Sequence, residues 1–247
     1  MKSVNTDIAY DYIRKRILSG DYPPGHPLLT ELLASEVKVS RTPVRDALRK
    51  LETDGLVSIR AHLGANVKKM ELKEFSEMCD LRLALESHAA GLAALHHTES
   101  DLREIQFALT GMKRLTELIA AQESDQPLLA ELIHEDVRFH IAVMTAAKND
   151  LMKKEILRLH LINRVVSGTS NDKIAVKKVD GDKRRRIVLE KHQDIYTAIA
   201  DSNPVSAKRE MEFHLQEMID HTLLVRNRVE SGVIARELSP EELAYSS

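Results

Sequence analysis

The sequence predicts a mainly α-helical protein built from an N-terminal winged helix-turn-helix and a C-terminal all-α antiparallel helical bundle. Short helical patterns and a β-hairpin pattern fill the first 70 residues, whereas residues 71–230 carry long runs of apolar residues at three- and four-residue spacing. Nine glycines, seven prolines and no tryptophan in 247 residues disfavour a β-rich second part. We expect domains at 1–70 and 71–230, followed by a C-terminal tail at 231–247.

The first predicted helix covers residues 5–19, and its apolar face is formed by Ile8, Ala9, Tyr12, Ile13 and Ile17. The segment DYPPG at 21–25 then interrupts the helical pattern. A second helix, ELLASEV at 31–37, follows Thr30, whose hydroxyl is placed to cap it.

A third helix is predicted over residues 40–54. Ser40 can accept a hydrogen bond from a free N–H group at the helix start, and Pro43 lies in the first turn, where a missing backbone donor costs nothing. One apolar stripe follows, formed by Val44, Leu48 and Leu51. Gly55 ends the helix.

The other side of this helix carries four polar residues, three of them cationic: Arg41, Thr42, Arg45 and Arg49. Such a helix fits the major groove of DNA, although an amphipathic surface helix with solvated charges would show the same pattern. The β-prone runs at 56–60 and 65–69 favour DNA, because Gly64 permits a tight hairpin between them. Helices followed by a hairpin in this order form a winged helix-turn-helix, whose last helix enters the major groove.

Charge is distributed unevenly along the chain. Residues 1–69 hold 12 Lys/Arg and 8 Asp/Glu, a net charge of +4, whereas the remainder carries −6. A basic N-terminal part on an acidic body is consistent with phosphate contact by the first part alone. Offsets this small are also common in proteins without a nucleic-acid partner, so the charge supports the motif and adds little by itself.

Two segments resemble the DNA-binding domain of GntR-type transcription regulators: ILSGDYPPGHPLLTELLA and SRTPVRDALRKLETDGLV, with Gly64 and Val67 after them. The resemblance implies that Arg41 and Arg45 make the principal base or groove contacts. It also implies that Ser40, Thr42 and Arg49 bind phosphate or fix the register of the helix on the DNA. It also implies that Gly64 lets the wing approach the minor groove. Because winged-helix dimers commonly read paired half-sites, we expect a homodimer on double-stranded operator DNA.

Six long helices are predicted after residue 69, at about 72–97, 99–121, 126–148, 150–167, 182–201 and 204–230. The charge run KKVDGDKRRR at 177–186 is interpreted as a solvated loop and helix start rather than as a second DNA contact.

The expected location is the cytoplasm. No apolar run approaches the roughly 18 residues that a membrane span requires, so no membrane partner is expected. The N-terminus also lacks the apolar core of a signal peptide. The single cysteine, Cys79, cannot form an internal disulfide, and its neighbours Met78 and Leu81 favour a buried structural thiol.

Four side chains of the predicted bundle are candidate metal ligands: Asp136, His140, His192 and His214. Asp136 and His140 are four residues apart in HEDVRFH, which places both on one helix face. The other two histidines each lie on an otherwise apolar stripe. One carboxylate and three imidazoles suit a divalent metal, zinc first, with nickel or manganese as alternatives. Spacing alone leaves open the plainer interpretation, in which each histidine is packed or hydrogen-bonded.

Three further segments resemble the FCD effector domain of the FadR subfamily: MCDLRLALESHAAGLAA (78–94), DVRFHIAVMTAAKNDLM (136–152) and EKHQDIYTAIAD (190–201). The resemblance implies a helical bundle around a ligand cavity. It also implies a repressor that leaves the DNA when its ligand binds. Metal-binding members use an Asp, a His four residues later, and two histidines from the last two long helices. The residues that match this pattern are Asp136, His140, His192 and His214.

A small carboxylate is the expected effector, because a metal with open positions beside an arginine suits an organic acid. Arg82 could bind that carboxylate through two parallel hydrogen bonds, or it could pair with Glu86 four residues on. Asn163 is a second candidate for effector contact. The remaining histidines of interest, His134, His160 and His221, are interpreted as structural, although His221 could support a metal ligand.

The sequence offers two alternative functions, an enzyme and a regulator that responds to the metal itself. HEDVRFH is not an H-E-x-x-H motif, and Glu131 with His134 supplies only one of the two E-x-x-H motifs that di-iron bundles need. The sequence also contains no nucleophile elbow, phosphate loop or dinucleotide fingerprint, so we predict that the protein is not an enzyme. The other alternative keeps the DNA-binding head and makes the metal itself the signal.

Overall fold

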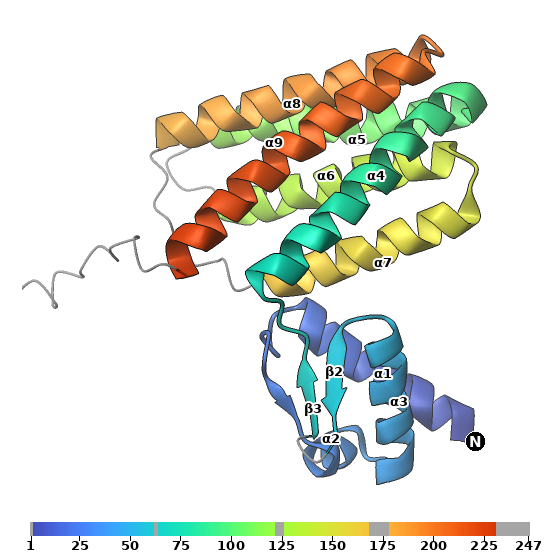
Figure 1. The fold of residues 1–247 in the computed structure, drawn as a ribbon, viewed down its shortest axis with the longest axis vertical. Helices are drawn as coiled ribbons and strands as arrows, with labels where there is room; N and C mark the ends of the chain where they lie inside the picture. The colour runs from blue at the N-terminus through green and yellow to red at the C-terminus, as the bar shows by residue number, and fades with distance from the viewer. Residues whose placement is uncertain (1, 62–63, 122–125, 168–177, 231–247) are drawn as a thin grey trace, which may run out of the picture.

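The computed structural model describes residues 2–61, 64–121, 126–167 and 178–230. It confirms the predicted fold class, a winged helix-turn-helix followed by a helical bundle (Figure 1). The N-terminal head contains α1 (Lys2–Leu18), β1 (Pro27–Leu28), α2 (Thr30–Val37), α3 (Arg41–Thr53), β2 (Val57–Arg60) and β3 (Gly64–Val67). The bundle contains α4 (Leu72–His96), α5 (Glu99–Ala120), α6 (Gln126–Ala146), α7 (Asp150–Ser167), α8 (Lys178–Ala200) and α9 (Pro204–Glu230).

The wing is a small antiparallel sheet in the order β1-β3-β2. β2 and β3 form the predicted hairpin, with Val57 opposite Val67 and Arg60 opposite Gly64. The strand β1, which pairs Pro27 with Asn66, is not predicted by the sequence. A two-residue strand is too short to show an alternating pattern, and its proline is tolerated because β1 lies at the sheet edge.

Several predicted helix starts differ from the structure, and α1 begins at Lys2 rather than at residue 5. The N-cap of α2 is Leu29, which makes no side-chain cap hydrogen bond, so the prediction that Thr30 caps this helix is wrong. α8 begins at Lys178 and includes most of the charge run, so the loop interpretation is wrong for residues 178–181. Lysine and arginine are good helix formers, and an ion pair between Arg185 and Asp182 adds local support.

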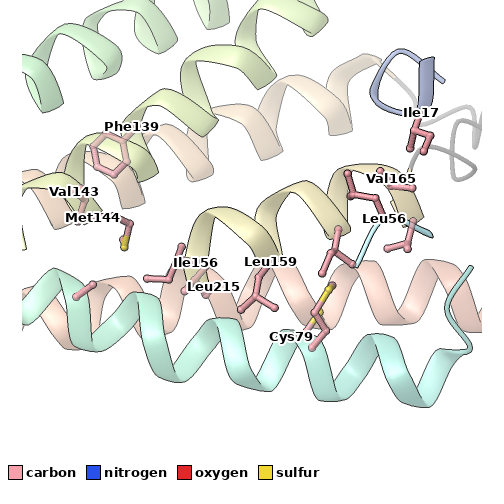
Figure 2. Packing of buried hydrophobic residues seen from close by; sticks show 14 of the residues in the cluster. Ile17, Leu56, Cys79, Phe139, Val143, Met144, Ile156, Leu159, Val165 and Leu215 are labelled. Atoms are coloured by element: carbon pink, nitrogen blue, oxygen red, sulfur yellow. The ribbon is translucent and has the colours of Figure 1, made fainter. Parts of the chain in front are cut away.

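Buried apolar side chains form one continuous core through head and bundle. Figure 2 shows this packing from Phe139 and Met144 in the bundle to Ile17 and Leu56 in the head. Cys79 is buried in this core, as predicted. The head lies beside α7 of the bundle (Figure 1). None of the helices in the described part of the chain is long and apolar enough to cross a membrane.

Candidate nucleic-acid interface and metal centre

Helix α3 has one buried and one exposed side. Its buried residues are Pro43, Val44, Ala47, Leu48 and Leu51. The opposite side exposes the four polar residues that the sequence analysis singled out, Arg41, Thr42, Arg45 and Arg49. Ser40 is the N-cap as predicted, but its hydroxyl makes no cap hydrogen bond and is exposed. The helix therefore presents cationic groups on the side away from the core.

One ion pair of α3 and the backbone of the wing also bear on the candidate DNA-binding surface. Arg41 Nη1 lies 2.8 Å from Glu31 Oε1 of α2, while the arginine side chain stays 63% exposed. In the wing, Gly64 adopts φ +84°, a conformation that side-chain-bearing residues rarely adopt. Among the described residues, and leaving out its chain neighbours, no heavy atom lies within 4 Å of the position that a Cβ on Gly64 would occupy.

The bundle brings three of the four candidate metal ligands together. His140 of α6, His192 of α8 and His214 of α9 are all buried, and their candidate ligand nitrogens lie within 4.8 Å of one another. Asp136, one turn before His140, contacts this group through His192, with Oδ1 lying 3.1 Å from Nε2. The Asp136 side chain is 33% exposed, so it lies at the edge of the cluster.

The distance between two of the histidines matches the spacing of ligands on a metal ion. Ligand nitrogens at about 2.0–2.1 Å from a tetrahedral metal lie about 3.3 Å apart. The Nε2 atoms of His140 and His214 are 3.3 Å apart. His192 Nδ1 lies 2.7 Å from the Val188 carbonyl oxygen, which orients the ring with Nε2 toward Asp136. In the described part of the chain, this buried Nε2 has no hydrogen-bond partner of good geometry, although a carboxylate lies next to it. A proton or a cation between the two atoms would resolve the conflict.

A second set of buried side chains, centred on Glu86, borders the three histidines. The sequence does not predict this set. Glu86 of α4 is completely buried, and its Oε1 lies 2.8 Å from Arg82 Nε and 3.1 Å from His160 Nε2 of α7. Its Oε2 lies 3.0 Å from His140 Nδ1, an approach too poorly aligned for a good hydrogen bond. The sequence predicts Glu86 only as a partner for Arg82 and gives His160 a structural role. The four-residue spacing of His160 from buried Ile156 was the available signal that this ring points inward.

The pKa values of the histidines shift in different directions because their surroundings differ. Burial lowers the pKa of His214 well below its ordinary value, and the nearby His192 and His140 rings lower it further. Burial also lowers the pKa of His160. Against the effect of burial, the Glu86 carboxylate raises the pKa of His140. A neutral His214 suits metal ligation, which requires an unprotonated ring nitrogen.

The two candidate effector residues lie in different settings. Arg82 is buried and pairs with Glu86, which was one of its two predicted roles. Its Nη2 also lies 3.4 Å from His160 Nε2. Asn163 lies on α7, one turn beyond His160, and is half-buried. His221 contacts Arg184.

A winged head with exposed arginines, joined to a helical bundle with a buried histidine cluster, defines the class of DNA-binding transcription regulators. The family comparisons agree. Residues 5–67 match the model of bacterial regulatory proteins of the gntR family, and residues 77–217 match the FCD domain. The chain therefore belongs to the GntR family of regulators with an FCD domain, as the sequence segments predicted.

Individual relatives are transcription regulators and not enzymes. The HTH-type transcriptional regulator LutR of Bacillus subtilis is 31% identical over 223 residues, which cover 83% of this chain and 94% of LutR. The HTH-type transcriptional repressor RspR of Escherichia coli is 27% identical over 90% of both chains. The structure of E. coli McbR/YncC is similar in fold, with a TM-score of 0.69, 19% identity and coverage of 90% of this chain and 98% of that one.

Proposed function

We propose that this regulator is a dimeric repressor whose bundle binds a divalent metal, zinc first, together with a small organic acid. The observation that carries the proposal is the convergence of three buried histidines from α6, α8 and α9. The metal would be held by His140, His192 and His214, with Asp136 as the fourth ligand. When bound, it would supply a positive charge, and a carboxylate would bind it by replacing the partly exposed Asp136.

The DNA contacts are assigned to the exposed side of α3 and to the wing. Arg41 and Arg45 would read the groove, while Ser40, Thr42 and Arg49 would bind phosphate or hold register. Gly64 would let the wing approach the minor groove. An effector can change DNA affinity only if it binds two arrangements of the heads with different affinity. Repression is supported by RspR, which is named as a repressor.

A second candidate function makes the metal itself the signal. The observation favouring it is the engagement of Arg82 by Glu86 and His160, which leaves that arginine less available to an acid. We therefore keep Arg82 and Asn163 as proposed effector contacts, and substitution of each would test them. The metal-and-acid version keeps preference because Asp136 is partly exposed and could give way to a ligand.

The test uses DNA selected by the protein itself from a random duplex pool. We expect one zinc ion per chain in the wild type and less than half of that in His192→Ala, measured by metal analysis after dialysis. Zinc alone should then not release the DNA, whereas one member of a carboxylate panel should weaken operator binding. Release of DNA by zinc without any acid would contradict the preferred version and support the second. Arg41→Ala/Arg45→Ala should abolish operator binding without changing zinc content.

A further inference from the structure

Helix α7 contacts both the histidine cluster and the DNA-binding head. On its inner side, His160 lies 3.1 Å from Glu86, whose other oxygen lies 3.0 Å from His140. Glu86 therefore connects one proposed metal ligand on α6 to a side chain on α7. Because Glu86 is fully buried, these contacts replace all of its contact with water.

On its outer side, α7 packs against the residues that follow the DNA-reading helix. A Cβ on Gly55 would lie 2.6 Å from Ile162 Cδ1 and 3.3 Å from Arg158 Nη1. Arg164 Nε also donates a hydrogen bond of 3.3 Å to the carbonyl oxygen of Leu18, at the end of α1. Figure 2 shows Leu56 and Ile17 of the head close to Val165 of α7. Two residues after His160, the same helix thus touches the end of α3.

The Glu86 group is better suited to connecting these parts than to binding a second metal. Glu86, His140 and His160 are close enough to share an ion. However, the guanidinium of Arg82 already lies 2.8 Å from Glu86 and 3.4 Å from His160, so a cation is in place there. A second metal would be repelled by this arginine. The carboxylate instead joins three side chains whose positions depend on one another.

We propose that Glu86 and His160 couple the metal centre to the DNA-binding head through α7. The proposal rests on the proposed metal at His140, His192 and His214. Binding at one nitrogen of His140 restricts the ring, and Glu86 contacts the other nitrogen. A change in the position of Glu86 is passed to α7 through its contact with His160. Helix α7 in turn contacts Gly55 through Ile162. Metal binding then changes how firmly the end of α3 is held.

Amide hydrogen exchange of the full-length chain tests the coupling at residues 54–56. Their amides donate to the carbonyls of Lys50, Glu52 and Leu51, so their exchange reports how firmly the end of α3 is held. With added Zn²⁺, we expect exchange here to slow by about fivefold or more in the wild type. His160→Phe should lose most of this response, while His160→Gln should keep it because an amide can still donate to Glu86. His134→Gln, at an exposed histidine of α6, should respond like the wild type.

A second pair of variants tests the outer end without touching the histidine cluster. Ile162→Val removes the carbon nearest to Gly55, whereas Ile156→Val makes the same change at another buried position of α7. We expect Ile162→Val alone to weaken the zinc response at residues 54–56. It should leave zinc affinity, measured against a chelator, within about threefold of the wild type, because truncated packing far from a ligand perturbs it little. This pair decides the matter if His160→Phe fails to fold.

Failure of the coupling and failure of the metal give different results. If Zn²⁺ binds the wild type and both Ile162→Val and His160→Phe keep the full response, the coupling is overturned and the metal stands. If Zn²⁺ does not bind, exchange is compared in chelator. Faster exchange at residues 54–56 in His160→Phe than in His134→Gln then supports the link through α7 without the metal. Equal exchange in those two variants overturns the link as well.

Discussion

At the scale of single residues, His140 has two ring nitrogens in different surroundings. Its Nε2 lies 3.3 Å from His214 Nε2, among the proposed ligands, and its Nδ1 lies 3.0 Å from Glu86. Although the approach is too poorly aligned for a good hydrogen bond, the negative charge of the carboxylate favours a proton on Nδ1 and leaves Nε2 free to bind a metal. The same carboxylate raises the pKa of His140 against the effect of burial. Glu86 therefore favours one orientation and one protonation pattern of this ligand.

Replacing Glu86 by Gln keeps the volume of the side chain and removes its charge. We expect zinc affinity to fall by about 10–100-fold, because the partner that orients His140 is weakened. Stability should also fall by roughly 3–5 kcal/mol, because the buried Arg82 loses its counter-charge. Competition with a chelator measures the affinity and urea unfolding measures the stability. Glu131→Gln, at an exposed glutamate of α6, is the control; equal affinities in the two variants would refute the role of Glu86.

At the scale of elements, contacts within one helix could be predicted and contacts between helices could not. The spacing of Asp136 and His140 follows from helix geometry, and resemblance supplied their partners on two other helices. The role of His160 could not be read in this way. Its contact with Glu86 depends on how α7 packs against α4, and no local spacing encodes that packing. The strand β1 could not be predicted for a related reason. It is a strand because it pairs with β3, and its own two residues do not show this.

Gly55 joins α3 to the wing, and its substitution tests the contact with α7. Gly55 and Gly25 adopt φ +79° and +82°, so alanine at either position should cost about 1–2 kcal/mol of backbone strain. Gly55→Ala should cost roughly 1–3 kcal/mol more, because its Cβ would lie 2.6 Å from Ile162 while Gly25 has open space around it. Urea midpoints measure both effects. Ile162→Ala should recover part of the extra loss in the double variant; no recovery would show that the contact is unimportant.

The start of α5 carries a pH-dependent contribution to stability. Asp101 accepts hydrogen bonds from the backbone and hydroxyl of Thr98 and pairs with Lys148. Although burial raises the pKa of Asp101, the Lys148 and Thr98 contacts lower it below its ordinary value. The folded-state pKa is therefore below the unfolded one, near 3.9. The resulting stability is present above about pH 4 and is lost as pH falls through the folded-state value.

Asp101→Asn should therefore cost about 0.3–1 kcal/mol at pH 7, the usual range for a carboxylate in the first turn of a helix. The difference from the wild type should shrink as the pH is lowered below about 4, because the wild-type carboxyl then becomes protonated. Urea unfolding of both proteins across this range measures the trend. A difference that grows toward low pH would contradict the assignment of the carboxylate as the stabilising form.

At the scale of the whole molecule, one core runs through the head and the bundle, so local changes in the bundle bear on the head. The proposed metal centre joins α6, α8 and α9 through His140, His192 and His214, which are well separated in the sequence. A ligand that holds such distant segments binds the folded chain and has no assembled site in the unfolded one. Its binding energy is therefore added to the free energy of unfolding.

Zinc should accordingly raise the unfolding temperature of the whole chain. At a free concentration of 100 times Kd, the expected stabilisation is about 2.7 kcal/mol. For a chain of this size, that corresponds to a rise in Tm of roughly 5–10 °C. Scanning calorimetry with zinc and then with excess chelator measures the rise and its reversal. His192→Ala should lose the rise, since it removes a proposed ligand from α8, whereas the exposed His134→Ala should keep it. An equal rise in His192→Ala would place the bound zinc elsewhere on the molecule.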